Sequence, residues 1–446
     1  MEPFNKRSRK EIVMITGIII VLIFILIAAL MMMRKIPAVL ALPVMAVAIA
    51  VAAGLPLTGE EGILTNVISG GALKLAGTYV AILFSCWLSQ ILYRTGVTDV
   101  IIKNAAELGG DKPYLISLAL CAVTAFLFTV LYGTGAVAMV GTIVLPIMMS
   151  IGIPPIVACN TFLAAMSAGY SLNPANIAAI TGITGVEAKD INLCAVILFI
   201  AGLLFTFVYL TYSFKKNGIK YAFAAPVKKE QEEEEVKSTY VKGWRGVLAC
   251  LTPVVVVAVM LIFKLEATTV FVIGIVWAIV FTFRGKWSKF SNLIVQSCYE
   301  GFKEGAPTVA LMFGIGMILN AMTAPTTQAV IKPFMVAITP HSAWGLIAFV
   351  CILCPLGLYR GPFNLMGLGA GLAASMLAVG VLPVAALSAV FYAAFRWPSQ
   401  SCPTSTQVVW ASNFVGYDPV TTSNPMQLPN WIVTAATVII LTFIYM

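Results

Sequence analysis

Apolar stretches long enough to cross a lipid bilayer recur along this chain from one end to the other. A helix that spans the hydrocarbon core needs about 20 predominantly apolar residues. Hydrophobic residues make up 60% of the 446-residue chain and charged residues only 10%, which excludes an ordinary soluble domain. Because backbone polar groups in lipid must be hydrogen-bonded within the protein, the sequence predicts an all-α polytopic membrane protein.

The first apolar stretch, about 12–33, follows four basic residues, an arrangement that is also typical of a secretory signal peptide. The stretch is long for a signal peptide, has no small-residue cleavage site and is followed at once by a second apolar stretch. We therefore interpret it as a retained span. We expect a multi-pass protein of the cell's inner (plasma) membrane.

The polar residues of the chain exclude several classes of function. The net charge of +9 indicates no nucleic-acid partner, because Lys and Arg gather at span ends, where membrane topology explains them. Cys351 and Cys354 are spaced like a metal pair but have no second pair and no histidine nearby. With His341 as the single histidine, neither a histidine-based metal site nor a Ser-His-Asp triad is available. We expect no enzyme and no cofactor, apart from Na⁺ as a coupling ion.

A hydrophilic segment, 214–245, divides the chain almost in half, and the two halves resemble each other. The matched segments keep a nearly constant offset of between 227 and 229 residues, which indicates duplication. The matches are YVAILF with TVALMF, TDVIIK with TQAVIK, VLYGTG with GLYRGP, SIGIPPIV with AVGVLPVA, and the helix-breaking SLNPAN with PSQSCPTST.

Three parts follow from the repeat: a first repeat at 1–213, a charged cytoplasmic linker at 214–245 and a second repeat at 246–446. Each repeat is expected to hold about five spans, a re-entrant hairpin and a helix broken by proline and polar residues. An odd number of crossings inverts the second repeat relative to the first. The hairpins are predicted at 113–150 and 343–378, with two full spans in each as the alternative.

The orientation in the membrane receives conflicting signals. Most lysines and arginines of the loops fall on the cytoplasmic side if the linker is cytoplasmic, as the positive-inside rule favours. The N-terminal cluster of Lys6, Arg7, Arg9 and Lys10 argues for the opposite orientation.

Broken spans and hairpin tips at matching places in inverted halves are typical of a transport site near the bilayer midplane. Arg360 is the only charged residue between His341 and Arg396. An arginine at the bilayer centre costs roughly 2.5–3.5 kcal/mol on insertion scales, so it needs a partner or a role. Neither hairpin after Asp111, nor either broken span before Glu187, carries Asp or Glu. The two arginines are therefore predicted to bind a substrate carboxylate, which a guanidinium grips through two hydrogen bonds.

Two sets of site residues are predicted. The substrate-binding residues are Arg360, Gly361, Asn364, Arg396, Ser401, Thr404, Ser405, Thr134, Asn173 and Asn176. The cation-binding residues, which would act through freed carbonyls or side-chain oxygens, are Gly133, Thr134, Gly135, Asn173, Asn176, Ser401 and Thr404.

Other roles for these residues remain open. Arg360 would snorkel to the headgroups if the hairpin arms are full spans, Arg396 would cap carbonyls or bind lipid phosphate at a span end, and the hydroxyls of 399–406 would only satisfy freed backbone groups. Glu300 and Glu304 are expected near a span end, mostly solvated. Coupling is therefore expected not to depend on a buried carboxylate of this chain.

The pattern resembles the ion transporter superfamily, which includes divalent-anion/sodium symporters and citrate, gluconate and dicarboxylate-type permeases. The resemblance implies a scaffold part, a transport part, elevator-type movement and a homodimer. It carries the site onto the tips Gly133–Gly135 and Gly361–Asn364 and the breaks Asn173–Asn176 and Ser401–Ser405. The tips read Gly-Thr-Gly and Arg-Gly-Pro in place of the Ser-Asn-Thr signature of the sodium/dicarboxylate branch.

The sequence thus predicts a secondary active transporter that moves a small organic anion, in particular a carboxylate, coupled to Na⁺ or H⁺. A cation/proton antiporter is the alternative among transporters. An integral-membrane enzyme or a channel is the alternative of another class.

Overall fold

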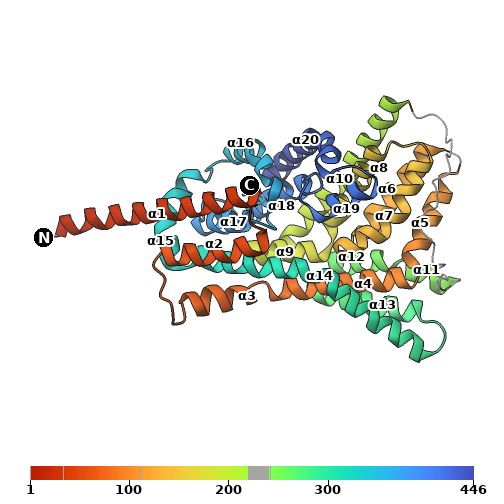
Figure 1. The fold of residues 1–446 in the computed structure, drawn as a ribbon, viewed down its shortest axis with the longest axis horizontal. Coiled ribbons are helices and arrows are strands. Elements are labelled where there is room, and N and C mark those ends of the chain that lie inside the picture. The colour runs from red at the N-terminus through yellow and green to blue at the C-terminus, as the bar shows by residue number, and fades with distance from the viewer. Residues whose placement is uncertain (1, 34, 111, 219–240, 242) are drawn as a thin grey trace.

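The computed structural model describes residues 2–33, 35–110, 112–218, 241 and 243–446, with side chains described from residue 13 onward (Figure 1). Most of the predicted linker, including its acidic run, lies outside the described residues. All the regular elements of the described ranges are helices.

The first half of the chain folds into α1 (Glu2–Met32), α2 (Ala38–Ala52), the π-helix η1 (Ile63–Gly70), α3 (Gly71–Leu73), α4 (Ala76–Arg94), α5 (Val97–Leu108), α6 (Pro113–Phe128), α7 (Gly133–Ser150), α8 (Pro155–Leu172), α9 (Pro174–Thr184) and α10 (Ala188–Asn217). Several of these helices begin at proline, whose missing N–H and fixed φ suit the first helical position.

The second half folds into α11 (Trp244–Cys250), α12 (Thr252–Phe263), α13 (Ala267–Thr282), α14 (Trp287–Thr323), α15 (Pro325–Ile338), α16 (Ala343–Leu353), η2 (Cys354–Arg360), α17 (Gly369–Val379), α18 (Val384–Ser399), α19 (Thr406–Phe414) and α20 (Pro419–Tyr445). From α4 onward, the order of long and broken helices in the first half recurs from the end of α14 onward in the second.

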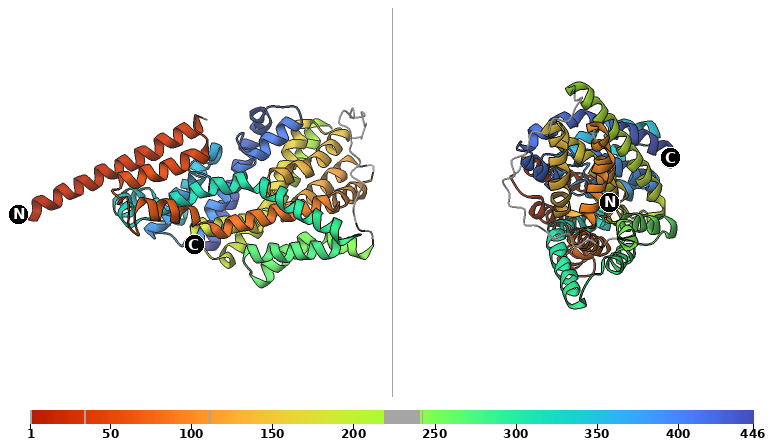
Figure 2. Two further views of the ribbon diagram at one scale, coloured as in Figure 1. Left: turned by 60° about the horizontal axis from the view of Figure 1, so that its bottom comes forward. Right: turned by 90° about the vertical axis from the view of Figure 1, so that its right-hand side faces the viewer.

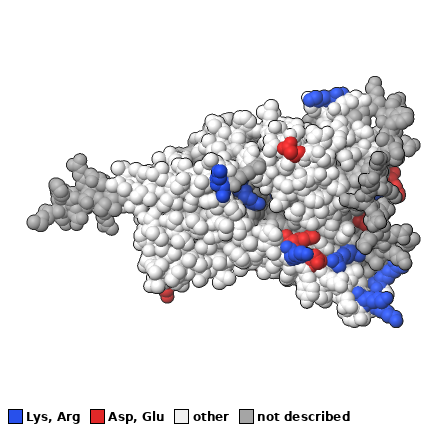
Figure 3. Space-filling model, viewed as in Figure 1, with Lys and Arg blue, Asp and Glu red and all other residues white. Residues whose placement is uncertain are grey.

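In the described part of the chain, 8 helices are long and apolar enough to cross a membrane, or up to 9 if the bent pair α11 and α12 forms one span. Their outward-facing side chains include strongly exposed Leu22, Leu26 and Leu204, as expected for a surface that meets lipid. Figure 3 shows that much of one face is uncharged, with most charged side chains toward the end opposite α1. The prediction of an all-α polytopic membrane protein is confirmed.

The longest helix, α14, runs through the middle of the molecule and packs against α2, α3, α4 and α17 (Figures 1 and 2). It has 37 residues, far more than the about 20 that a span needs, so it extends well beyond a single span length. The close contact with α4 depends on glycine, because a Cβ on Gly301 would overlap the backbone of Trp87. The extension places residues 300–304 within a continuous helix, away from its end.

The two-arm units differ in length between the halves. Helix α17 has 11 residues, and such a helix covers about 16 Å, roughly half of the hydrocarbon thickness of about 30 Å. This supports a re-entrant hairpin in the second half. The arms α6 and α7 have 16 and 18 residues, so both a hairpin and two spans remain compatible with the first unit.

Ser167 on α8 and Arg396 on α18 are joined by hydrogen bonds, although they are 229 residues apart, a separation within the predicted offset of 227–229 residues. Equivalent residues of two repeats meet only where the axis that relates the repeats passes, so this contact supports a two-fold relation between the halves. Inversion of the halves across the membrane stays a prediction, as does the division into three parts.

Candidate functional site

A cavity of about 370 Å³ lies where the hairpin tips and the helix breaks of both halves meet. Most of the predicted substrate-binding residues line it, namely Thr134, Asn176, Arg360, Asn364, Arg396, Thr404 and Ser405. Asn173, Gly361 and Ser401 do not line the cavity, and neither do Gly133 and Gly135, although both glycines contact a side chain that does.

Arg396 projects from α18 into the interior and is 4% exposed. Its Nε donates to Ser167 Oγ at 3.0 Å and its Nη2 donates to Ser399 Oγ at 2.9 Å. The guanidinium carbon lies 5.3 Å from the centre of the Tyr170 ring, a cation–π contact that holds the fork in place. Burial this deep excludes a lipid-facing role, so the alternative that Arg396 binds lipid phosphate is wrong.

Arg360 lies at the tip of the second hairpin, where the backbone is strained. Tyr359 and Arg360 have φ values of 55° and 60°, the left-handed region that side chains other than glycine rarely adopt. Gly361, which precedes Pro362, has an ordinary φ of −72°, so the unusual backbone falls on the two residues before this Gly-Pro pair. Such strain persists only where the surroundings enforce it, and it clusters at functional sites. Here Arg360 Nη1 donates to the carbonyl of Met366 at 2.9 Å.

Neither arginine has a carboxylate within ion-pair distance among the residues that the structure describes. Their nearest polar partners are hydroxyl and carbonyl oxygens, which orient the guanidinium groups but do not neutralise them. The cavity thus presents two fixed positive charges inside the protein.

Two asparagines hold the broken backbone together. Asn173 caps α9 by accepting from Ala175 N at 3.0 Å, and its amide donates to the carbonyls of Phe128 and Leu131 in the first tip. Asn364 accepts from Met366 N at 3.0 Å and donates to Gly357 O at 3.2 Å in the second tip. Because the Asn173 amide is occupied by the backbone, its place in the structure is that of a connector between break and tip.

The first tip contains the N-terminal end of α7. Gly133, Thr134 and Gly135 are the first residues of α7, so their N–H groups have no partner within the helix. Tyr132, at the N-cap, makes no side-chain cap to them. Helix N-termini attract anions, whereas the sequence predicted a cation held by carbonyl or side-chain oxygens at these residues.

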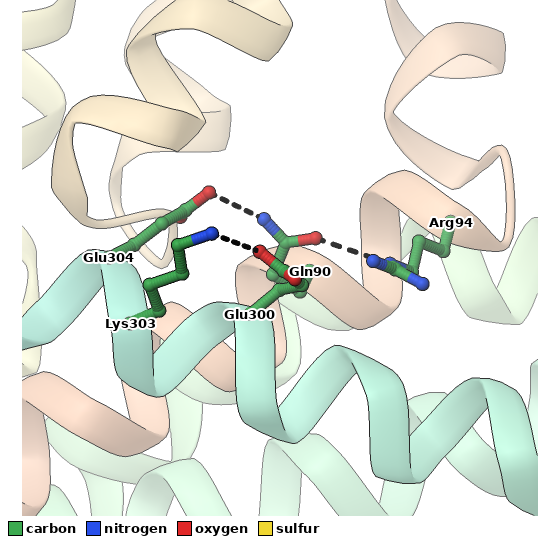
Figure 4. Close-up of polar contacts among 5 residues, drawn as sticks. All are labelled: Gln90, Arg94, Glu300, Lys303 and Glu304. Atoms are coloured by element: carbon green, nitrogen blue, oxygen red, sulfur yellow. Dashed lines mark hydrogen bonds and ion pairs between the residues drawn. The ribbon is translucent and has the colours of Figure 1, made fainter.

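Glu304 on α14 approaches this tip, and the sequence analysis missed it. Its Oε1 accepts from Gln90 Nε2 at 2.6 Å, and the Gln90 oxygen in turn accepts from Arg94 Nε at 3.4 Å (Figure 4). Its Oε2 is buried and has no hydrogen-bond partner among the described residues. A Cβ added to Gly135 would overlap the Glu304 carboxylate, so glycine is required there for the approach.

The expectation that Glu304 is solvated at a span end is wrong, because α14 continues through it without a break. One signal in the sequence was available. Gly301 and Gly305 form a small-xxx-small pattern, which allows two helices in a membrane to approach closely. That pattern marks the face of α14 that packs on α4, and Glu304 lies within it.

Tyr170 and Tyr132 also line the cavity. The Tyr170 ring centre lies 5.5 Å from that of Tyr132, and its face is turned to Arg396. The aromatic pair therefore connects the first tip to the buried charge of the second half.

Comparisons with known proteins identify the fold. No protein-family model and no curated protein sequence matches this chain. Among solved structures, the chain is similar to the YdaH transporter of Alcanivorax borkumensis, whose crystal structure is described as having an unusual topology, with a TM-score of 0.56 and 15% sequence identity. The similarity covers 86% of this chain and 87% of that one. The chain is thus a multi-pass, helical membrane protein with a fold like that of this transporter.

Proposed function

We propose that this protein is a secondary active transporter that moves a small organic anion, in particular a carboxylate. The observation that carries the proposal is the cavity between the halves, where Arg360 and Arg396 stand without a carboxylate partner among the described residues. An uncompensated arginine inside a membrane protein is costly, and such residues mark substrate pathways. A bound carboxylate supplies the missing partner and matches the planar guanidinium fork.

The cavity suits a small solute. Its volume of about 370 Å³ lies in the lower part of the range for small-molecule sites, about 300–1,000 Å³. Hydroxyl and amide groups from both halves, among them Thr134, Asn176 and Thr404, provide hydrogen bonds around the charged centre. The fold shared with a known transporter supports movement of the bound anion across the membrane.

The movement is proposed to be of the elevator type, coupled to Na⁺ or H⁺, in a homodimer of the plasma membrane. Helices α2, α4, α13 and α14 pack together as one group, and α6, α8, α10, α18 and α20 as another. The first group is the proposed scaffold and the second belongs to the proposed transport part.

A cation/proton antiporter is the second candidate, and Glu304 is the observation that favours it, because such antiporters depend on a buried carboxylate. The balance of charge in the cavity decides against it. Two arginines and one glutamate line the cavity, so its lining carries a net positive charge when all three are ionised. A positive cavity repels cations and concentrates anions.

The test is binding and uptake by the purified protein. Thermal unfolding is measured in the presence of citrate, gluconate or succinate, since a ligand that binds the folded state raises the unfolding temperature. The carboxylate that stabilises the protein is then followed as a labelled compound into proteoliposomes. Saturable accumulation of the intact anion supports the proposal. Exchange of Na⁺ or K⁺ for protons without any anion dependence would establish the antiporter instead.

A further inference from the structure

The carboxylate of Glu304 occupies a place where an anion is favoured. It lies against the first turn of α7, whose N–H groups are free of intrahelical partners, and Gly135 lets it approach the backbone. The partial positive charge of a helix N-terminus stabilises an adjacent anion. Glu304 also lines the same cavity as Arg360 and Arg396.

Only one of its two oxygens is satisfied. The Gln90 amide binds Oε1, and the Arg94 contact fixes which way this amide faces, while Oε2 is buried and has no hydrogen-bond partner in the described ranges. A buried carboxylate with an orphan oxygen has two ways to be satisfied. It can bind a proton on Oε2, or it can move to a new partner.

The charged and titratable groups around Glu304 come from three elements. Arg94 and Cys86 face it from α4, Tyr132 lies at the tip before α7, and Glu300 and Lys303 precede it on α14. Arg360 and Arg396 line the same cavity as Glu304. No ion pair joins Glu304 to any of these cations in the part of the chain that the structure describes.

We propose that Glu304 is the proton-carrying residue of this transporter. When Glu304 is ionised, its carboxylate is the anion at the N-terminal end of α7. When Glu304 is protonated, a carboxylate of the transported solute takes its place at the N-terminal end of α7. The solute then lies between the first tip and the arginines. The idea rests on the proposed function, and it selects H⁺ over Na⁺ as the coupling ion.

Coupling follows from this exchange of anions. Glu304 takes up one proton from the side to which the cavity is open, and the anion binds. After the change of access, both leave on the other side and no covalent bond is made or broken. A cation such as Na⁺ needs a cage of oxygens, whereas the first tip offers N–H groups.

The decisive variant is Glu304→Gln, which mimics the protonated carboxylate and keeps an oxygen for the Gln90 amide. Glu300→Gln is the matched control, since Glu300 lies one turn earlier on α14, is 46% exposed and pairs with Lys303 at 3.7 Å. Both changes remove one negative charge from the same helix. Only Glu304→Gln removes it from the cavity.

Proton linkage is counted by calorimetric titration of citrate, gluconate or succinate in two buffers that differ in ionisation enthalpy. Wild type and Glu300→Gln should take up about one proton per bound anion beyond any proton the anion itself binds. Glu304→Gln should bind the anion with no linked proton. In proteoliposomes, Glu304→Gln should still exchange internal for external anion, because the folded site is intact. It should lose the accumulation that a pH gradient drives. In wild type, with one proton per monovalent anion, the ratio of internal to external anion concentration should reach about tenfold per pH unit.

The outcomes separate the two ideas. If a carboxylate binds and Glu304→Gln takes up protons as wild type does, or if Na⁺ alone drives accumulation, the role of Glu304 is refuted and the anion transporter stands. If no carboxylate binds to wild type, the proposed function fails and the role of Glu304 fails with it.

Discussion

The tip of the first hairpin and the tip of the second line one cavity, but they differ in charge and in backbone conformation. The first is built from Gly133, Thr134 and Gly135, is neutral and relaxed, and takes up the positive φ of 94° at a glycine. The second places its positive φ values on Tyr359 and Arg360 and carries its charge itself. The negative charge beside the first tip belongs to Glu304, which lies on another helix, α14.

This difference shows how two hairpin tips that line one cavity can make it chemically one-sided. If both tips carried an arginine, Glu304 would be the single carboxylate facing three arginines in the cavity lining. With the charge on one side only, the neutral tip is free to accept either Glu304 or a substrate anion. The asymmetry between the tips is therefore the feature that the following experiments address, beginning with the largest expected effect.

Removing the charge of the second tip should have the strongest consequence. Arg360→Gln leaves a bound carboxylate without its charged partner, a loss that typically costs about 2–5 kcal/mol of binding free energy. Arg360→Lys keeps the charge but loses the fork, so it should also bind much more weakly while folding normally. Binding of citrate, gluconate or succinate is measured by calorimetry, with Lys289→Gln, an exposed lysine, as the control. Unchanged affinity in Arg360→Lys would exclude a direct contact with the anion.

Filling the space at the first tip should disconnect it from α14. Gly135→Ala places a methyl group where the Glu304 carboxylate lies, and such overpacking costs about 1–3 kcal/mol. The matched control is Gly77→Ala on α4, where a Cβ meets nothing within 4 Å. The double variant Gly135→Ala/Glu304→Ala shortens the side chain that the new methyl group overlaps, so it should recover most of the lost stability. Stability is measured by thermal unfolding in detergent. Equal losses in the single and double variants would show that the two residues are not in contact.

The connection between break and tip is expected to be structural in the first half. Asn173→Ala removes the cap of α9 and the two donors to the tip carbonyls, at a cost of about 0.5–2 kcal/mol for the cap. The unfolding temperature should fall, and anion affinity should change less than in Arg360→Gln. A variant with normal stability and lost binding would instead place Asn173 in contact with the substrate.

The strain of the second tip should give the smallest effect. Tyr359→Asn puts a residue that tolerates left-handed backbone at φ 55°, and this should offset part of a cost of roughly 1–2 kcal/mol. Gly133→Ala at the first tip should act in the opposite direction, because its φ of 94° disfavours a side chain. The free energy of unfolding of each variant is measured by chemical denaturation. Destabilisation by both would mean that the side chain of Tyr359 contributes more than its backbone costs.

The sequence predicted much of the cavity and misplaced part of it. Arg360 and Arg396 were recognisable because a charge in an apolar flank is rare, and Asn176 and Thr404 because they stand beside helix breaks. Both arginines and both polar residues line the cavity. Asn173 was grouped with them by its position, but hydrogen bonds to Phe128 and Leu131 in another segment decide where its amide points.

The amino-acid sequence by itself determined the membrane class, the all-helical fold and the approximate positions of the breaks. These depend on local properties: the length of apolar runs, the missing N–H of proline and the cost of an arginine in lipid. Only the tertiary structure brought Glu304 to Gly135, because the two residues lie far apart in the sequence and in different halves of the chain. Their contact depends on how closely α14 approaches the first tip and the neighbouring α4, a distance set by packing at glycines. Because no local rule fixes such a distance, the negative charge of the cavity became visible only in the folded chain.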